Sequence, residues 1–273
     1  MPDDNVVAVM YSGGTDSTYA ALLQIPDFDH IRLVTFIRRG LINPRKPYHH
    51  FERLKKAFPD KEITYDQLGF EDIYQKVTPH DAKLKAQQDV LQQNIGALWE
   101  DPNGKHYGRE EYEKKLKILF MTNECIQCKV AMHIAAIKYC LENNIHEICD
   151  GSNTEQLDDG SQLEDVKSIG KNIFKRYGIN FFAPVFHVPA DERCRALYEA
   201  GITDRLNHKT LEKNHKIPSR QLQCTIPSSV FWTVCVFPWV VYNGPSCDDY
   251  IKMSCAYYKT EMDKWLKEYN ILP

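Results

Sequence analysis

Residues 6–17 of the chain read VVAVMYSGGTDS, and this stretch decides the fold. The valine-rich run at 6–10 is typical of a strand buried in a parallel sheet. Two glycines end the run, and residues 17–23 have the composition and spacing of a helix start. The sequence therefore predicts a strand, a glycine turn and a helix N-terminus in direct succession.

A junction of this kind binds anions. Gly13 and Gly14 let the backbone approach a ligand closely, and the unpaired N–H groups of the first helical turn point at it. Asp16 adds a carboxylate that could hold Mg²⁺ or orient a hydroxyl. The hydroxyl donors are Ser12, Thr15 and Ser17. We predict a polyphosphate cradle; the alternative is an ordinary serine–glycine turn before a helix.

The order Ser-Gly-Gly-x-Asp-Ser at 12–17 also resembles the signature of the PP-loop ATP pyrophosphatases. It differs from the P-loop of other nucleoside triphosphatases because no lysine follows the glycines. The resemblance implies an α/β fold, namely an open parallel-sheet, Rossmann-like domain that binds a nucleotide.

Whole-chain composition narrows the class further. The 273 residues, 43% of them hydrophobic, suit one large α/β domain or a nucleotide domain with a smaller extension. The net charge of −3 gives no general preference for nucleic acid. No apolar run approaches the roughly 20 residues that span a bilayer, and the N-terminus lacks a signal pattern. We expect a cytoplasmic protein without a membrane segment.

The remaining elements follow from hydrophobic periodicity. Predicted strands cover 31–37, 63–68, 147–150 and 180–187, and predicted helices cover 48–58, 122–144, 191–200, 203–211 and a last segment ending near 269. Pro184 argues for a sheet edge or a strand end. We expect a nucleotide-binding domain at 1–187, with a helical insertion at about 81–119. The insertion is either a lid or substrate surface, or simply a solvated helical segment. A small C-terminal region at 188–273 completes the chain.

Candidate nucleotide contacts lie at the ends of two of these strands, namely an aromatic residue near the end of strand 31–37 and polar residues just after strand 147–150. In an open α/β sheet the ligand crevice lies outside the carboxyl ends of the strands. Phe36 is therefore a candidate to contact adenine, with ordinary strand core as the equal alternative. The loop that begins at Gly151 and includes Asn153 offers a second polar rim to the same crevice.

Nine cysteines in a chain of this length do not form a secreted disulfide framework, and clustered thiols suggest metal binding or catalysis. At about 100° per residue, Cys125 and Cys128 fall together on one helix face. The opposite face is the apolar stripe Ile126, Val130, Ile134 and Ile137. Cys140 falls near that stripe and is predicted to be a core thiol. The pair lies in the first turn of its helix, where the macrodipole favours thiolate.

Cys224 adds a third candidate thiolate, because it lies in a polar loop between Pro218 and Pro227. Three thiolates without a fourth ligand suit a [4Fe-4S] cluster with one open iron better than a closed Zn²⁺ site, which takes four ligands. Three interpretations stay open: a cluster or metal on Cys125, Cys128 and Cys224, persulfide or disulfide catalysis by the same residues, or neither.

With these cysteines, the chain resembles the sulfur-transferring branch of the PP-loop superfamily, which includes tRNA thiolases and LarE-type sulfurtransferases. The resemblance implies an enzyme that adenylates a substrate oxygen with ATP, releases pyrophosphate and replaces AMP with sulfur. Residues 12–17 would hold the phosphates and Mg²⁺, with Asp16 catalytic. The adenosine would be seated by Phe36, Gly151 and Asn153, and sulfur would be delivered by Cys125, Cys128 and Cys224.

The acceptor stays open between a small molecule or cofactor precursor and tRNA, because no recognisable RNA-binding appendage precedes the signature. A sulfur donor and a homo-oligomer are further expectations. One rival interpretation is a PP-loop amidating or ligating enzyme with structural Zn²⁺. The other is a nucleotide-binding module without chemistry, which the intact Ser12, Asp16 and Ser17 argue against.

Overall fold

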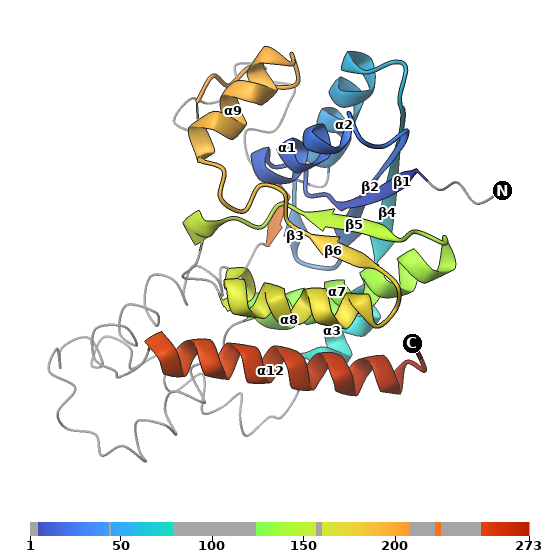
Figure 1. Ribbon diagram of the computed structural model, residues 1–273, viewed down its shortest axis with the longest axis vertical. Helices are drawn as coiled ribbons and strands as arrows, with labels where there is room; N and C mark the ends of the chain where they lie inside the picture. Colours follow the sequence, from blue (N-terminus) through green and yellow to red (C-terminus); the bar gives the residue numbers. More distant parts are fainter. Residues whose placement is uncertain are drawn as a thin grey trace, which may run out of the picture.

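The structure, a computed structural model, describes residues 5–43, 45–78, 124–156, 160–207, 222–224 and 247–272. Within these ranges the chain forms a β-sheet between two layers of helices, and one long helix lies outside the second layer (Figure 1). The predicted insertion at 81–119 lies outside the described residues. The predicted division at residue 187 stays a prediction.

The sheet has five strands in the order β4-β2-β1-β5-β6, and every neighbouring pair is parallel. The strands are β1 (Val6–Met10), β2 (His30–Ile37), β4 (Glu62–Gly69), β5 (Glu147–Asp150) and β6 (Asn180–Phe182). The predicted open parallel α/β fold is confirmed. The strand order reverses between β1 and β5, and in such sheets that switch point is where ligands bind.

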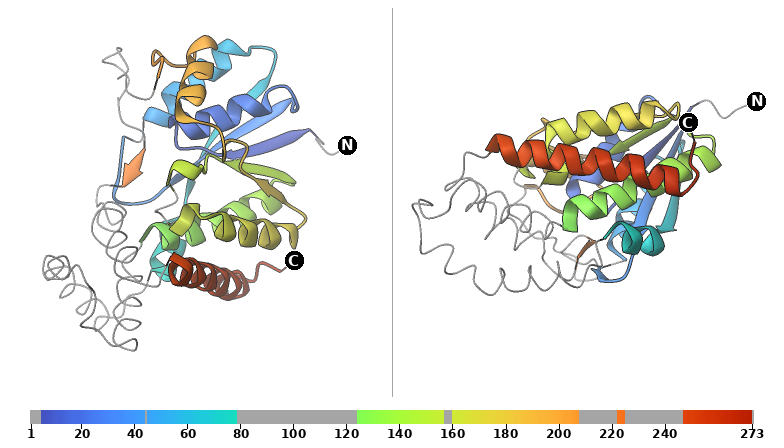
Figure 2. Two further views of the ribbon diagram at one scale, coloured as in Figure 1. Left: turned by 60° about the vertical axis from the view of Figure 1, so that its left-hand side comes forward. Right: turned by 90° about the horizontal axis from the view of Figure 1, so that it is seen from below.

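The helices divide between the two faces of the sheet. One face carries α1 (Thr15–Gln24), α2 (Lys46–Ala57) and α9 (Ala190–Glu199); the other carries α3 (Glu71–Val77), α7 (Glu124–Glu142) and α8 (Glu164–Lys175) (Figures 1 and 2). The long helix α12 (Cys247–Glu268) packs across α7 and α8. Alternate residues of β1 feed the two cores, with Val7 and Val9 in one and Ala8 and Met10 in the other.

Several boundaries differ from the prediction. β6 ends at Phe182 instead of residue 187, so Pro184 lies beyond the strand, and β6 is an edge strand as expected. Residues 203–207 are not helical, so the prediction of a helix at 203–211 is wrong for its described part. There the Thr203 hydroxyl oxygen accepts a hydrogen bond from the Arg205 N–H, a local turn that competes with helix.

Two features were not predicted. Helix α8 occupies residues 164–175, for which no element was expected. The second is a two-stranded antiparallel ribbon, which joins β3 (Leu41–Ile42) to β7 (Gln223–Cys224) and pairs Leu41 with Cys224. The expected loop around Cys224 thus contains a short strand. None of the described helices has the length and apolar character that a membrane span requires.

Candidate functional site

The signature turn joins β1 to α1 in a conformation that needs its glycines. Gly13 has φ +68°, and a Cβ there would lie 2.4 Å from Pro47 Cα. Gly14 is the N-cap of α1 and has no side chain with which to cap it. The Ser12 and Ser17 hydroxyl oxygens lie 3.1 Å apart, and Ser12 Oγ accepts a hydrogen bond from the Gly14 N–H. The turn therefore presents backbone donors and two hydroxyls together.

Gly151 brings the loop after β5 against this turn. A Cβ on Gly151 would lie 2.6 Å from the Ser17 backbone nitrogen and 2.9 Å from the Asp16 carbonyl carbon. A larger residue would separate the loop from α1. The predicted second rim is therefore in direct backbone contact with the cradle.

The Asp16 carboxylate is held by an ion pair and a hydrogen bond. Its Oδ1 lies 2.8 Å from Arg193 Nε on α9, and its Oδ2 accepts a hydrogen bond from Asn153 Nδ2 at 3.1 Å. Arg193 also pairs with Glu155 at 2.9 Å. Burial raises the pKa of Asp16 although Arg193 opposes the shift. A Mg²⁺ ion on Asp16 would have to compete with this guanidinium.

Thr15 also faces α9. Its side chain forms a hydrogen bond with the buried thiol of Cys194. The hydroxyl predicted to serve phosphate is thus engaged with the helix behind the cradle. Cys194 is buried, as expected of a structural thiol.

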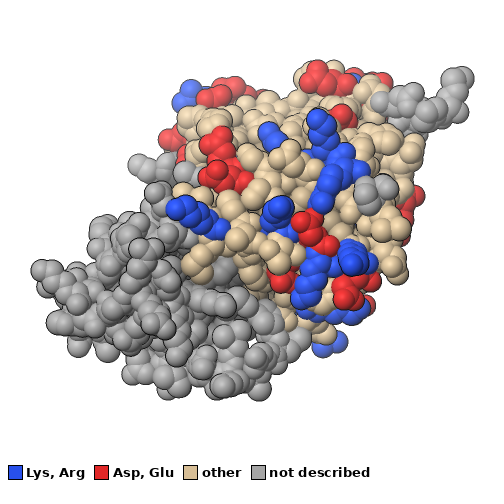
Figure 3. All heavy atoms as spheres, turned by 60° about the horizontal axis from the view of Figure 1, so that its bottom comes forward, with Lys and Arg blue, Asp and Glu red and all other residues tan. Residues whose placement is uncertain are grey.

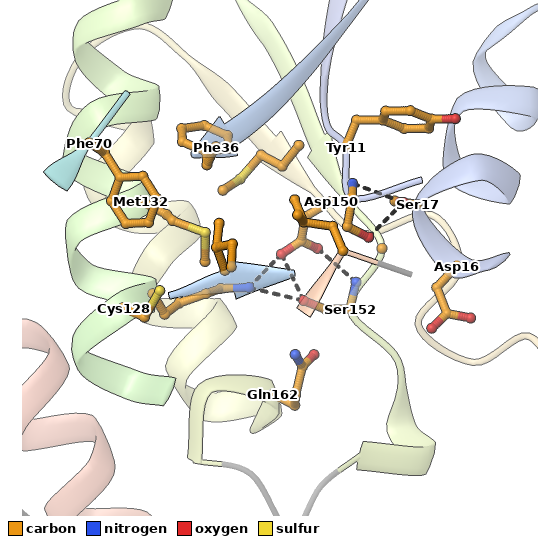
Figure 4. A pocket seen from close by; sticks show the side chains of 16 residues that line it. Tyr11, Asp16, Ser17, Phe36, Phe70, Cys128, Met132, Asp150, Ser152 and Gln162 are labelled. Carbon is orange, nitrogen blue, oxygen red and sulfur yellow. Dashed lines mark hydrogen bonds and ion pairs between the residues drawn. The ribbon is translucent and has the colours of Figure 1, made fainter. Parts of the chain in front are cut away.

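A cavity of about 300 Å³ opens at the carboxyl ends of β1, β2 and β5, next to the cradle (Figure 4). Of the residues that the sequence singled out, the lining includes Ser12, Asp16, Ser17, Phe36, Cys128 and Gly151. The apolar part of the lining is Met10, Phe36, Leu41, Phe70, Met132 and Leu222. The cavity thus brings the signature, the end of β2, the loop after β5 and the start of α7 to one place.

A buried ion pair forms the floor of the cavity. Lys129 Nζ donates to Asp150 Oδ2 at 2.6 Å and to Ser152 Oγ at 3.1 Å, and Ser152 Oγ donates to Asp150 Oδ2 at 2.7 Å. Burial alone would raise the pKa of Asp150, but the ammonium and these hydrogen bonds hold that pKa at about 2. Sequence reasoning did not assign Lys129 or Ser152 to the site; the signal was a lysine directly after Cys128.

The thiols divide as the helical geometry predicts. The stripe of Ile126, Val130, Ile134 and Ile137 is fully buried, and so is Cys140. Cys125 and Cys128 are half-buried, and neither takes part in a disulfide. Cys128 lines the cavity. The prediction of Cys140 as a core thiol is confirmed.

The position of Cys224 is defined by its backbone. β7 pairs it with Leu41, and both Leu41 and Leu222 line the cavity, so the strand runs along the cavity edge. Among the side chains that the structure describes, no three His, Cys, Asp or Glu residues converge as metal ligands; the Cys224 side chain is outside that set. A joint ligand role for Cys125, Cys128 and Cys224 stays a prediction.

Comparison with protein-family models finds no match, and comparison with curated proteins finds none either. Among solved structures, the chain is similar to the U34-tRNA thiolase NcsA from Methanococcus maripaludis with its [4Fe-4S] cluster. The TM-score is 0.41 at 13% identity, over 96% of this chain and 72% of that one. A predicted subunit of tRNA methyltransferase from Methanocaldococcus jannaschii gives a TM-score of 0.38 at 16% identity, over 81% and 100%.

Fold and site by themselves define a class. The chain is an open parallel α/β protein with a glycine turn and a helix N-terminus at the switch point of its sheet, the place where we predict anion binding. A cavity with a buried ion pair and a half-buried thiol adjoins that site.

Proposed function

We propose that the chain is an ATP-dependent sulfurtransferase of the PP-loop class. The observation that supports this most strongly is the shared cavity. The hydroxyls of Ser12 and Ser17 and the thiol of Cys128 line the same cavity, and the strand that carries Cys224 runs along its edge. A nucleotide bound on the cradle would therefore lie beside a sulfur-bearing wall.

The cradle would bind the β- and γ-phosphates. The N–H groups of the first turn of α1 and the two serine hydroxyls are the donors, and Gly13, Gly14 and Thr15 supply the backbone. Adenosine would lie toward Phe36 and Gly151, while Asn153 acts through its hydrogen bond to Asp16. Lys129 supplies a cation to the same cavity. Mg²⁺ would accompany the triphosphate, with Asp16 as its candidate ligand after exchange with Arg193.

The reaction has two displacements. The acceptor oxygen bonds to the α-phosphorus of ATP, and the bond from that phosphorus to pyrophosphate breaks. If the nucleophile is hydrosulfide, its sulfur bonds to the acceptor carbon, AMP leaves with the oxygen, and the S–H proton passes to solvent. If it is the outer sulfur of a persulfide on one of Cys125, Cys128 and Cys224, AMP leaves in the same way and a second of these thiolates then attacks the inner sulfur. The S–S bond of the adduct breaks with its electron pair on the product sulfur, and the disulfide that remains would be reduced by an external thiol. Adenylation thus converts a poor leaving group into a good one.

The donor set fits an iron–sulfur cluster in its chemistry. Two half-buried thiols lie in the first turns of α7, where the helix dipole favours thiolate, and a third cysteine is placed by its backbone at the cavity edge. Cys125, Cys128 and Cys224 would hold the cluster, whose open iron would supply a binding position for sulfide.

The acceptor is either tRNA or a small molecule. The face that carries α12 shows Lys and Arg side chains among Asp and Glu (Figure 3), and Arg176 of α8 pairs with Asp263 of α12 at 2.6 Å. This mixture of charges selects neither acceptor. AMP release on mixing the protein and ATP with bulk tRNA, compared with a panel of small carbonyl compounds, distinguishes the two.

The first test is chemical analysis of anaerobically purified protein. We expect iron and acid-labile sulfide in matching amounts, lost in Cys128→Ser and Cys224→Ala and retained in Cys140→Ser. The last variant is the matched control, because Cys140 lies on the same helix in the core. Zinc without sulfide would contradict the sulfurtransferase and favour a ligating enzyme; no metal would leave persulfide chemistry, with the same cysteines required for activity.

The second test addresses the cradle. Asp16→Ala should abolish AMP formation with the active acceptor, since it removes the carboxylate that the signature supplies, while the far-ultraviolet circular dichroism stays unchanged. Undiminished AMP formation would overturn the role assigned to the signature.

A further inference from the structure

Helix α12 lies outside the second helix layer and packs across α7 and α8 (Figures 1 and 2). Its inner face recurs every four residues, and each member is at most 2% exposed: Ser254, Tyr258, Met262 and Leu266. Gly170 of α8 makes room for the tyrosine, because a Cβ added there would lie 3.1 Å from Tyr258 Oη. The same Cβ would lie 3.7 Å from His133 Cε1. Helices α7, α8 and α12 therefore meet at this point, which we call the α12 interface.

The α12 interface is centred on a buried histidine of α7. His133 is 1% exposed, and its Nδ1 lies 2.5 Å from Tyr258 Oη in a hydrogen bond. Its ring is nearly perpendicular to the rings of Phe174, Phe181 and Tyr258, with centroids 5.0 to 5.7 Å away. Three aromatic rings and one hydroxyl suit a neutral imidazole, whereas an imidazolium there would lack a carboxylate partner among the described residues.

Two polar atoms of this interface have no hydrogen-bond partner within the part of the chain that the structure describes. They are His133 Nε2 and Ser254 Oγ, and both residues are at most 1% exposed. An unpaired buried polar atom is unfavourable, and the penalty disappears when water reaches the atom. These two atoms therefore lower the free energy that is needed to release α12 from its neighbours.

The charges around His133 also favour its neutral form. Burial lowers the pKa of His133 well below its usual value, Lys129 one turn earlier on α7 lowers it further, and Asp150 on β5 opposes the shift. Lys167 of α8 adds positive charge beside Lys129 and Asp150. From α12 the titratable group that faces the imidazole is Tyr258, whose pKa is raised by burial. Protonation of His133 is thus easier once α12 has moved away.

We propose that α12 is an acid-released clamp: protonation of His133 places an unpaired charge in the α12 interface, and α12 then detaches from α7 and α8. Helix α7 carries Cys128 and Lys129 of the cavity wall, so release of α12 removes the outer support of that wall. The clamp requires neither a nucleotide nor cysteine chemistry, so its test is independent of the proposed function.

Hydrogen–deuterium exchange of the full chain, resolved by peptide mass spectrometry, tests the clamp. A histidine whose pKa is lowered in the docked state stabilises docking at high pH, and this contribution is lost as pH falls below the ordinary value of about 6.5. From pH ~7.5 to pH ~5.5 the open fraction of α12, corrected for intrinsic exchange rates, should rise about tenfold. Peptides of β1 and β2 should not change. Equal corrected exchange of α12 at both pH values, or an equal rise in β1, would overturn the clamp.

Two histidine variants assign the release. His133→Gln keeps a side chain that can form a hydrogen bond with Tyr258 but does not titrate, so the exchange of α12 should lose its pH dependence. His50→Gln is the matched control, because His50 is also buried but lies on α2, on the other face of the sheet. This control should keep the tenfold response. A response that survives in His133→Gln would overturn the assignment.

Ser254→Ala tests the α12 interface without changing a titratable group. Removing an unpaired buried hydroxyl should slow the exchange of α12 about fivefold at both pH values and leave the pH response in place. Unchanged or faster exchange would show that the hydroxyl is paired in solution and would contradict the weak interface on which the clamp depends. Circular dichroism checks that each variant is folded; if His133→Gln is not, the pH response of the wild-type protein and Ser254→Ala still decide.

Discussion

Two ion pairs lie at the site, one between α7 and β5 and one between α1 and α9, and they differ in exposure. Lys129 and Asp150 are 7% and 6% exposed and lie 2.6 Å apart. In the second pair, Arg193 is 3% exposed but Asp16 keeps 26%. The pKa of Asp150 is held at about 2, whereas the pKa of Asp16 is raised. Both cations lower the pKa of their carboxylate, yet the net shifts of the two carboxylates are opposite in sign.

The two pKa shifts differ in sign because the cation beside Asp150 pairs with no other described carboxylate, whereas the cation beside Asp16 is shared with a second one. Asp150 receives the whole charge of Lys129 and a second hydrogen bond from Ser152, which together outweigh burial. For Asp16, burial raises the pKa by more than Arg193 lowers it. Arg193 is shared with Glu155, and the negative charge of Glu155 raises the pKa of Asp16 further. Asp150 is held as a carboxylate. In the proposed function, Asp16 would be the carboxylate that exchanges Arg193 for the metal ion of a bound nucleotide.

Breaking the more deeply buried pair, Lys129–Asp150, should have the largest effect on the free energy of unfolding. Lys129→Met leaves Asp150 buried without its counter-ion, and we expect a loss of about 3–5 kcal/mol in the free energy of unfolding by urea. The double variant Lys129→Met/Asp150→Leu should recover most of this loss, since neither charge remains. A single variant as stable as the wild-type protein would show that the pair is not buried in solution.

The fall in stability at acid pH, which we call the acid limb, tests the lowered pKa of Asp150. The folded pKa of Asp150, about 2, lies below the ordinary 3.8, so its ionised form stabilises the fold above pH ~4, and this contribution is lost as pH falls through the folded value. We expect roughly 2 kcal/mol from this group between neutral pH and pH 2. Asp150→Asn should flatten that part of the stability curve. An unchanged acid limb would contradict the assigned pKa.

Removing Arg193, the cation of the more exposed pair, should lower the free energy of unfolding by less. Arg193→Met leaves Asp16 partly hydrated, and we expect a loss of about 1–2 kcal/mol in unfolding free energy. Arg193→Lys keeps the charge but not the fork that reaches both Asp16 and Glu155, so it should recover part of the loss. A loss as large as that of Lys129→Met would erase the difference between the pairs.

We expect the smallest effect on stability from the protonation of Asp16, whose pKa is raised in the folded protein. A raised folded pKa means that protonation of Asp16 favours the fold, so the wild-type protein gains some stability from this group as pH falls below the folded value. Asp16→Asn lacks this gain, and its stability should fall more steeply from neutral to acid pH than that of the wild-type protein. A shallower fall, measured by thermal unfolding at several pH values, would reverse the assignment.

Sequence reasoning succeeded where the pattern is local. The continuous apolar run of β1 is typical of a strand covered on both faces, the stripe of α7 repeats at the period of a helix, and both are buried as expected. The glycines of the signature also follow from local backbone geometry, because Gly13 has φ +68°. These features need no knowledge of the rest of the chain.

Sequence reasoning failed where contacts between distant parts of the chain determine the local structure. Within α8, Gly170 and Lys167 interrupt the helical pattern, yet Gly170 makes room for Tyr258 Oη, 3.1 Å from an added Cβ, and Lys167 Nζ lies 3.0 Å from the centre of the Phe186 ring. Lysine side chains usually face solvent, but Lys129 is buried, and its partner Asp150 lies on a different element. A two-residue strand such as β7 has no period to detect.

The position of the sheet's switch point has a consequence for the integrity of the whole chain. β1, β2 and β4 come from residues before 78, and β5 and β6 come from residues after 124, so the cavity lies on the seam between two halves of the sheet. A nucleotide there would touch Ser12 and Phe36 on one side and Cys128 and Ser152 on the other. It would fasten the halves together, and at a hundredfold excess over its Kd would add about 2.7 kcal/mol against their separation. Bound nucleotide would then protect the chain from proteolysis.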